Sequence, residues 1–468
     1  MTVAALSYLL LLIFGKWLLN DPDTHWQIAI GDWIVAHGDV PRVDTFSYTM
    51  TDAPWISSQW LAQVLFAKAF ALGGWTAVVA LTAAAIALAF ALLAQFLLER
   101  LAVVPALTLT GAAFIISVPH MVARPHALAL PVMAAFVAGL LRARDANRPP
   151  PFALLPLLTL WANLHGGFTF GIAIIAPIAL EALLAAPKAE RLQVTARWAL
   201  YGLLALTAGC ITPYGPESIL VTARVLGLGP ALDLISEWQP QDFYKFSGFE
   251  LCLLLGIGFA LYRGLTLPPI RLLVVLGLLH MALAHMRNAE LLALLAPLFM
   301  AAPLAPQIGR AEAVKPESRR LLGTSALVAA LIAATFAAGP TLAYQPRPTV
   351  TPAQAVAALK SSGAKHVLNS YDFGGYLIAS GVAPFIDGRT ELYGGDFVDR
   401  HHNALMLGNV EAFFQLLHYH RIDATLLRLG TPAIGLLDRM SGWKRIYADN
   451  FAVVHIRTDV PPAGPEQP

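Results

Sequence analysis

The sequence predicts a polytopic α-helical membrane protein that carries a small α/β domain in its C-terminal part. Three observations predict this class. Of the 468 residues, 57% are hydrophobic and only 13% are charged, whereas soluble domains carry about 25% charged residues. Many apolar stretches approach the length of about 20 residues that a spanning helix needs. After Tyr344 the composition changes, because charged residues return and short strand-like segments appear.

About eleven apolar segments are predicted to span the membrane. The first, at about 3–19, runs directly into Asn20-Asp21-Pro22-Asp23 without a small-residue cleavage site, so we expect a retained span and not a cleaved signal peptide. The others are expected at about 75–98, 103–118, 126–141, 152–164, 167–186, 198–212, 249–262, 271–286, 290–304 and 322–340. The predicted domains are therefore a membrane domain of residues 1–343 and a C-terminal domain of residues 344–468.

Lys and Arg are more frequent in one set of connections, for example at Arg142, Arg144 and Arg148. Basic connections face the cytoplasm, so we expect a cytoplasmic N-terminus. An odd number of spans then places the C-terminal domain on the outer side. The net charge of +2 does not suggest a nucleic-acid partner, and membrane lipids are the expected surroundings.

Residues 20–74 form the first outer loop, and long ordered loops are usually functional. Within it, Thr24–His37 has the period of an amphipathic helix that lies in the membrane interface. Asp21 and Asp23 stand where the first span leaves the bilayer, at a depth where ionisable groups are costly. Either could accept a proton from a hydroxyl nucleophile or hold a divalent cation. The alternative is that Asp23 or Thr24 caps the helix and that Asp21 is solvated.

This layout resembles the GT-C fold of polyprenyl-phosphate-sugar-dependent glycosyltransferases. That group includes protein O-mannosyltransferases, the aminoarabinose transferase of lipid A and the oligosaccharyltransferases. The shared features are an acidic pair at the start of the first outer loop, interfacial helices, many spans and a C-terminal outer domain. The motif departs from the common pattern, because Pro22 separates the two acids. The stretches "LWANLHGGF", "TPYG", "EWQPQDF" and "YDFGGYLI…PFIDGRTELY" are similar to those of uncharacterised bacterial membrane proteins.

The resemblance implies a bacterial inner-membrane enzyme that moves a sugar from polyprenyl phosphate to a lipid, glycan or protein acceptor at the periplasmic or extracellular face. It implies that Asp21 or Asp23 is the general base, and it leaves open a divalent cation, Mg²⁺ or Mn²⁺, at these two residues. Charge develops on the leaving phosphate, so a cation is needed there. The candidates are two Arg-His neighbourhoods, with the residues Arg124, His126, His285 and Arg287. Each Arg could instead extend toward lipid headgroups.

Other polar residues on the outer side are candidates for lining a substrate cavity. They are His25, Asn163, His165, Glu237, Trp238, Asp387, Arg389, Glu391 and Tyr393. Alternatives remain for most of them. Asn163 and His165 could belong to a tight turn between two spans, Glu237-Trp238 could be an interface anchor, and residues 387–393 could form a salt-bridged structural loop. No HxxH or HExxH spacing joins the histidines, so a zinc site is not expected.

The C-terminal domain is predicted to be a small α/β unit. Strands are expected at His366–Asn369, Ala383–Ile386, Ala424–Leu427, Trp443–Tyr447 and Ala452–Ile456, and helices at 396–418 and 431–440. No glycine-rich phosphate-binding motif follows a strand, so a soluble nucleotide is not the expected ligand.

A second class of function stays open. The chain could be a non-catalytic protein with a GT-C-like fold, or a transporter or assembly subunit for an envelope polysaccharide. A transporter should show charges buried in the middle of spans or paired broken helices. Few charges lie in the middle of the predicted spans, which counts against transport.

Overall fold

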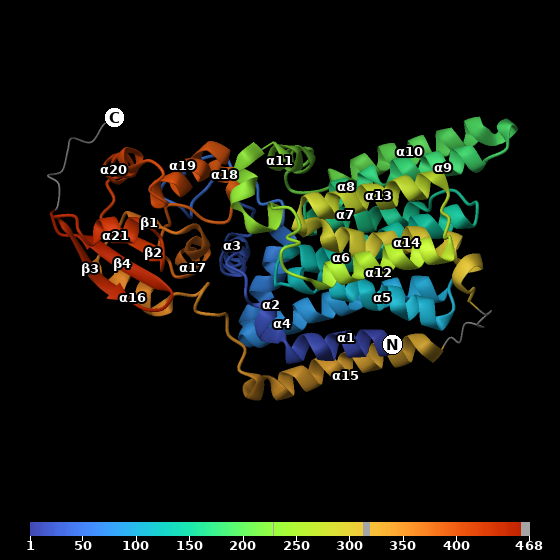
Figure 1. Ribbon diagram of the computed structural model, residues 1–468, viewed down its shortest axis with the longest axis horizontal. Helices are drawn as coiled ribbons and strands as arrows, with labels where there is room; N and C mark the ends of the chain where they lie inside the picture. The colour runs from blue at the N-terminus through green and yellow to red at the C-terminus, as the bar shows by residue number, and fades with distance from the viewer. Residues whose placement is uncertain (228, 312–318, 460–468) are drawn as a thin grey trace.

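The computed structural model describes residues 1–227, 229–311 and 319–459 (Figure 1). Long helices run roughly along the longest axis of the molecule and form a bundle, and a small sheet domain lies at one end of it (Figure 1). Helix α3 (Thr24–His37) and helix α17 (Gly374–Ala379) pack against each other where the two parts meet. A few residues lie outside the described ranges: 228 and 312–318 of the predicted membrane domain, and 460–468 of the predicted C-terminal domain.

A helix forms in each of the eleven apolar segments. The helices of the bundle are α1 (Thr2–Ile13), α2 (Gly15–Leu18), α4 (Trp60–Leu98), α5 (Val103–Ser117), α6 (Pro125–Asp145), α7 (Leu155–Leu164), α8 (Phe168–Ala173), α9 (Ile175–Ala185), α10 (Arg191–Gly209), α12 (Gly248–Arg263), α13 (Pro269–Ala284), α14 (Ala289–Ile308) and α15 (Arg319–Leu342). Among the helices that the structure describes, five are long and apolar enough to cross a membrane, and four shorter ones are also apolar. The chain is therefore a helix-rich membrane protein, and the count of eleven spans stays a prediction.

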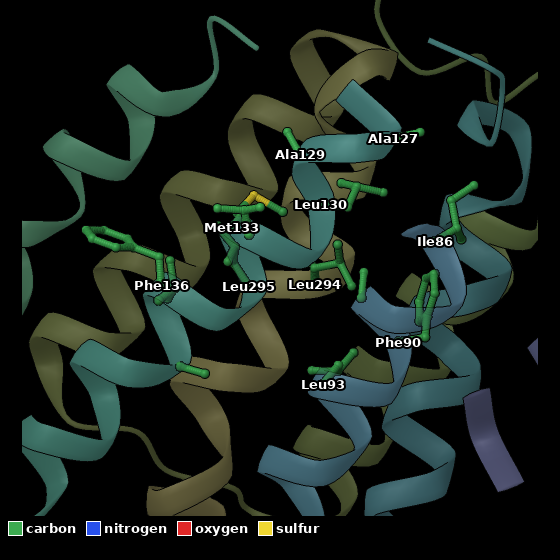
Figure 2. Packing of buried hydrophobic residues seen from close by; sticks show 14 of the residues in the cluster. Ile86, Phe90, Leu93, Ala127, Ala129, Leu130, Met133, Phe136, Leu294 and Leu295 are labelled. Carbon is green, nitrogen blue, oxygen red and sulfur yellow. The ribbon is translucent and has the colours of Figure 1, made fainter. Parts of the chain in front are cut away.

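The centre of the bundle is formed by α4, α6 and α14, whose side chains interdigitate (Figure 2). Phe90 and Leu93 from α4 and Leu294 from α14 are no more than 1% exposed. Lipid is as apolar as these side chains, so within a membrane close packing and not removal of water holds the helices together. This rigid centre supports the helix ends that carry polar groups.

Helix α4 changes direction at two glycines. Gly73 and Gly74 leave the helical conformation, and Gly74 has φ +57°, ψ −147°, a conformation that side chains rarely allow. The segment before the kink packs against α3, where a Cβ on Gly31 would lie 2.1 Å from the carbonyl oxygen of Gln63. The glycine at 31 thus allows the two helices to touch backbone to backbone.

Helix α3 has the predicted bounds but not the predicted surroundings. Trp26, Ile30 and Ile34 are buried, and so is Ile28 on another side of the helix. The helix is enclosed between α4 and α17 instead of lying on the lipid surface. The sheet domain covers the face that the sequence pattern assigns to lipid.

Within residues 353–459, four strands form one sheet in the order β1-β2-β4-β3. Strands β1 and β2 are parallel, and β4 pairs antiparallel with both β2 and β3. The elements are α16 (Ala353–Ser362), β1 (Val367–Asn369), α18 (Thr390–Tyr393), α19 (Gly395–Leu405), α20 (Val410–Tyr419), β2 (Ala424–Arg428), α21 (Ala433–Leu437), β3 (Trp443–Ala448) and β4 (Ala452–Arg457). The predicted strand at 383–386 forms only a bridge between Pro384 and Val367. Proline has no N–H to donate to a ladder, and the amides of Phe385 and Ile386 bind the side chain of Asn369 instead.

Charged residues gather at the far end of the bundle, away from the sheet domain. Arg271 is only 3% exposed and pairs with Asp145 at 2.5 Å and with Glu181 at 2.9 Å. Arg100 also pairs with Asp145, at 3.2 Å. A buried arginine needs such partners to offset its lost hydration. These ion pairs tie the ends of α6, α9 and α13 together opposite the polar cluster described next.

Candidate functional site

Four separate turns of the chain meet at the end of the bundle that faces the sheet domain. They are Asp21-Pro22-Asp23 before α3, Arg124 before α6, Glu237 in the short helix Ser236–Trp238, and Arg287 in the short helix Met286–Asn288. Pro125 is the first residue of α6 and disfavours a helical conformation at the residue before it. Arg124 is accordingly extended, with φ −118° and ψ 159°, and its side chain reaches beyond the end of the helix.

Arg124 contacts three carboxylates at once. Its Nε pairs with Asp21, its Nη2 lies 2.7 Å from Oδ2 of Asp23, and its Nη1 lies 2.5 Å from Oε2 of Glu237. Every nitrogen of the guanidinium thus faces an acidic oxygen. The planar fork of arginine suits this arrangement, which a lysine ammonium could not reproduce.

The two aspartates are also held by residues of loop one, the segment 20–59 between α2 and α4. The backbone N–H of Asp23 donates to Oδ1 of Asp21 at 2.7 Å, and Nε1 of Trp26 donates to Oδ1 of Asp23 at 3.0 Å. Asp23 makes no side-chain capping bond to α3, and the hydroxyl of Thr24 donates to the carbonyl of Ala123. The side chain of Asp21 is 5% exposed and that of Asp23 is 17% exposed. Asp23 is therefore the more accessible of the two.

Burial and the two arginines shift the pKa values of Asp21, Asp23 and Glu237 by different amounts. Burial raises the pKa of Asp21 to about 7, helped by the charge of Asp23 and opposed by Arg124. Burial also raises the pKa of Asp23, again against Arg124. For Glu237 burial alone would raise the pKa, but Arg124 and Arg287 outweigh it and lower the pKa to about 2. Glu237 is thus ionised at neutral pH, while Asp21 can exchange a proton there.

Arg287 is the open cation of the cluster. In the described part of the chain, its contacts are an ion pair with Glu237 at 3.8 Å and the ring face of Trp238 at 4.3 Å. Its side chain is 33% exposed. His285 does not share this opening, because its Nδ1 lies 2.6 Å from the carbonyl oxygen of Trp238 and so fixes the turn before α12. Arg287 therefore has donors to offer to a further anion.

A second polar group lies next to this cluster and includes a residue that the sequence analysis missed. Glu290, in the first turn of α14, is 5% exposed, and its buried Oε1 has no hydrogen-bond partner among the residues that the structure describes. Its Oε2 lies 3.5 Å from Nε2 of His126, whose ring centre is 6.2 Å from that of His165. An isolated acid in an otherwise apolar helix is the one signal that could have identified Glu290.

The sheet domain closes one side of the acidic turn through glycines. A Cβ on Gly375 would lie 2.4 Å from the carbonyl oxygen of Pro22, and a Cβ on Gly388 would lie 2.0 Å from Oδ1 of Asp23. Tyr371 is close enough for the charge of Asp23 to contribute to raising its pKa, after burial, and its hydroxyl hydrogen bonds with Thr390 at 2.7 Å. The acids therefore lie between the bundle and the sheet domain.

Three of the predicted cavity residues form a buried network that joins loop one to the sheet domain. Arg389 is fully buried and pairs with Asp387 at 2.7 Å and with Asp44 of loop one at 2.5 Å. The hydroxyl of Tyr393 donates to Asp387 at 2.7 Å. Glu391 accepts from Nε1 of Trp55 at 3.1 Å, which adds a second link to loop one. These contacts match the alternative of a salt-bridged structural loop.

Two other predicted residues make structural contacts. Nε2 of His25 lies 2.8 Å from the hydroxyl of Thr351, with its ring edge-on to Trp75 and Tyr376. The amide of Asn163 accepts from Nε1 of Trp60 and donates to the carbonyls of Thr159 and Ile211. Both therefore lie outside the cluster around Arg124.

The residues around Asp21 and Asp23 do not fit a divalent cation as they are arranged. Mg²⁺ and Mn²⁺ need several oxygens that point at one position. Here the three carboxylates point at the nitrogens of Arg124, which occupies that position. Across residues 1–227, 229–311 and 319–459, no group of three or more His, Cys, Asp or Glu side chains is placed to hold a metal ion.

The fold is similar to that of a known glycosyltransferase. The archaeal oligosaccharyltransferase AglB from Archaeoglobus fulgidus, in complex with an inhibitory peptide and a dolichol-phosphate, aligns over 91% of this chain and 68% of its own, with a TM-score of 0.54 and 12% identical residues. No protein-family model and no curated protein matches the sequence. At this identity the likeness concerns the fold, and it agrees with the GT-C-type layout, a helix-rich membrane part followed by a small sheet domain.

Proposed function

We propose that the protein is a membrane glycosyltransferase that moves a sugar from a polyprenyl-phosphate donor to an acceptor at the extracytoplasmic face. The observation that carries this proposal is the cluster around Arg124, in which three carboxylates and a second, open arginine meet at one end of the bundle. Such a cluster combines a proton acceptor with a cation for a departing phosphate. The fold likeness to an oligosaccharyltransferase supports the same reaction class.

In the proposed reaction, a nucleophilic oxygen or nitrogen of the acceptor attacks the anomeric carbon of the donor sugar. The bond from that carbon to the phosphate oxygen breaks, and polyprenyl phosphate leaves with the electron pair. The proton of the acceptor passes to a loop-one carboxylate. We assign this role to Asp23, because its carboxylate is more exposed than that of Asp21. Asp21 then positions Asp23 by accepting its backbone N–H and by pairing with Arg124.

The departing phosphate is assigned to Arg287. Its guanidinium is partly exposed, and the ring of Trp238 and the carboxylate of Glu237 keep it in place without using all its donors. A bidentate arginine would stabilise the charge that develops on the phosphate. Arg124 is fully engaged with carboxylates and therefore contributes charge balance around the acids.

The proposed setting is the inner membrane of a bacterium, with the N-terminus in the cytoplasm and the cluster at the periplasmic or extracellular side. The orientation rests on the positive-inside distribution of Lys and Arg, and the bacterial inner membrane rests on the resemblance to bacterial membrane proteins. The far end of the bundle, with Arg100, Arg142 and Arg144, would then face the cytoplasm. The acceptor would be a lipid, a glycan or a protein.

The test is to replace Asp23 with Asn in cells that depend on the protein, and to measure lipid-linked sugars and glycosylated acceptors by mass spectrometry. We expect the lipid-linked sugar to accumulate and the modified acceptor to disappear. Asp32→Asn is the matched control, because Asp32 is exposed on the same helix and makes no contact with Arg124 among the described interactions. Wild-type glycan in the Asp23→Asn strain would exclude the catalytic assignment.

A second candidate follows from the same contacts. Since Arg124 satisfies all three carboxylates, the cluster could serve structure alone, as in a non-catalytic assembly subunit for an envelope polysaccharide or in a transporter. In that case Asp23→Asn and Arg124→Gln would lower the amount of folded protein in parallel with any change in glycan. A glycan defect at unchanged protein level favours the enzyme.

A further inference from the structure

The cluster around Arg124 has the composition of a divalent-cation site, but a guanidinium already occupies the place between its carboxylates. Asp21, Asp23 and Glu237 come from two segments more than 200 residues apart and direct one oxygen each toward a common centre. Arg124 fills that centre, and its own side chain is only 19% exposed. A guanidinium and a divalent cation cannot share this position, because both need the same oxygens and carry charge of the same sign.

The charges of the cluster support the same conclusion. Arg124 and Arg287 supply two positive charges close to Glu237, whose carboxylate pairs with both. A free Mg²⁺ or Mn²⁺ would have to displace Arg124 and leave its guanidinium buried without a partner. Leaving a buried charge without its partner is strongly unfavourable. Arg124 is part of the chain, so its presence beside the carboxylates does not depend on the ion concentration in solution. Arg124 is therefore favoured over a free divalent cation at this position.

We propose that Arg124 takes the place of a divalent cation, so that this site binds no metal in the wild-type protein and becomes a Mn²⁺ site when the guanidinium is removed. The binding part of this inference holds whatever reaction the protein performs. One consequence rests on the proposed function, namely that sugar transfer continues in the presence of a chelator.

The experiment measures Mn²⁺ binding to the purified full-length protein by electron paramagnetic resonance of the free ion. Wild-type protein and Arg124→Lys, which keeps the positive charge, should bind no stoichiometric Mn²⁺. Arg124→Gln should bind one Mn²⁺ per chain, and the double variant Arg124→Gln, Asp23→Asn should bind it at least tenfold more weakly. Arg287→Gln is the matched control for Mn²⁺ binding, since Arg287 contacts Glu237 but neither aspartate, and it should likewise bind no stoichiometric Mn²⁺.

Two results would overturn the inference. One is stoichiometric Mn²⁺ binding by the wild-type protein that Asp23→Asn abolishes. The other is a folded, monodisperse Arg124→Gln protein that binds no Mn²⁺. If Arg124→Gln does not fold, the comparison of wild type with Asp23→Asn decides by itself. The proposed function fails separately, if cells lacking the protein show no change in lipid-linked sugars, and that result leaves the binding measurements intact.

Discussion

Gly388 approaches Asp23 so closely that only a hydrogen fits between them. A Cβ atom at position 388 would lie 2.0 Å from Oδ1 of Asp23 and 3.0 Å from Nε1 of Trp26. The sheet domain therefore touches the acidic turn at the hydrogen bond that orients Asp23. A residue of the last domain thus sets the position of a carboxylate near the start of the chain.

Gly388→Ala should displace the Asp23 carboxylate from Trp26 and Arg124. We expect sugar transfer to fall at least tenfold, because a displacement of about 1 Å at a reacting group can cost a factor of 100. The measurement is the ratio of glycosylated acceptor to lipid-linked donor at equal protein level. Gly111→Ala is the control, since no atom of the described residues lies within 4 Å of a Cβ there. Full activity of Gly388→Ala would show that Asp23 does not need its observed position.

Arg389→Ala should separate loop one from the sheet domain. The change leaves Asp44 and Asp387 buried without their cation, which costs about 3–5 kcal/mol. We expect a lower thermal unfolding midpoint and faster proteolysis within residues 20–59. Arg428→Ala removes an exposed ion pair with Asp372 and should change stability by only about 0–1 kcal/mol. Equal effects of the two variants would contradict the proposed importance of the buried network.

The raised pKa of Asp21 predicts a pH dependence of stability. Its ordinary value is 3.8 and its value in the folded protein is about 7, so between these values the folded state holds a proton that the unfolded state releases. This contribution to stability is present at low pH and is lost as the pH rises through about 7. The midpoint of wild-type protein should therefore fall more between pH 5 and pH 8 than that of Asp21→Asn. Exposed Glu411→Gln should follow the wild type, and parallel curves for Asp21→Asn would refute the prediction.

Glu290→Met should make the protein more stable and less active. The change removes a buried carboxylate whose Oε1 has no partner in the described part of the chain. An apolar side chain of similar volume carries no such desolvation cost. Side chains that lower the stability of the folded protein are typical of functional sites. A higher unfolding midpoint with reduced transfer would support a role of Glu290 and His126 beside the cluster. A lower midpoint would show that the contact with His126 is structural.

Much of the fold could be predicted from local patterns. Apolar length located a helix in every expected segment, and the polar period gave the bounds Thr24–His37. These features depend on neighbouring residues only. The burial of α3 could not be predicted, because its outer face is covered by α17, which comes more than 300 positions later in the chain.

The candidate site shows the same limit. The sequence allowed each charge at a helix end to be selected, namely Asp21, Asp23, Arg124 and Glu237. It could not show that the three carboxylates meet at the guanidinium of Arg124, because that is a contact between distant segments. The pair Asp44 and Arg389 is 345 positions apart. Glu290 was missed because an acid in the first turn of a helix is common, being favoured by the helix dipole. Its unpartnered oxygen is visible only once the neighbours are in place.

The contact between residues 21–23 and the glycines at 375 and 388 has a consequence for biogenesis. The ribosome makes the acidic turn first and the glycines that cover it among the last, after every helix of the bundle. Until the final domain has folded, loop one has no Arg389 to pair with Asp44. A nascent chain therefore leaves the acidic turn uncovered until residues 375–388 have been made and folded. Under the proposed function, folding of the sheet domain would be the step that completes the site.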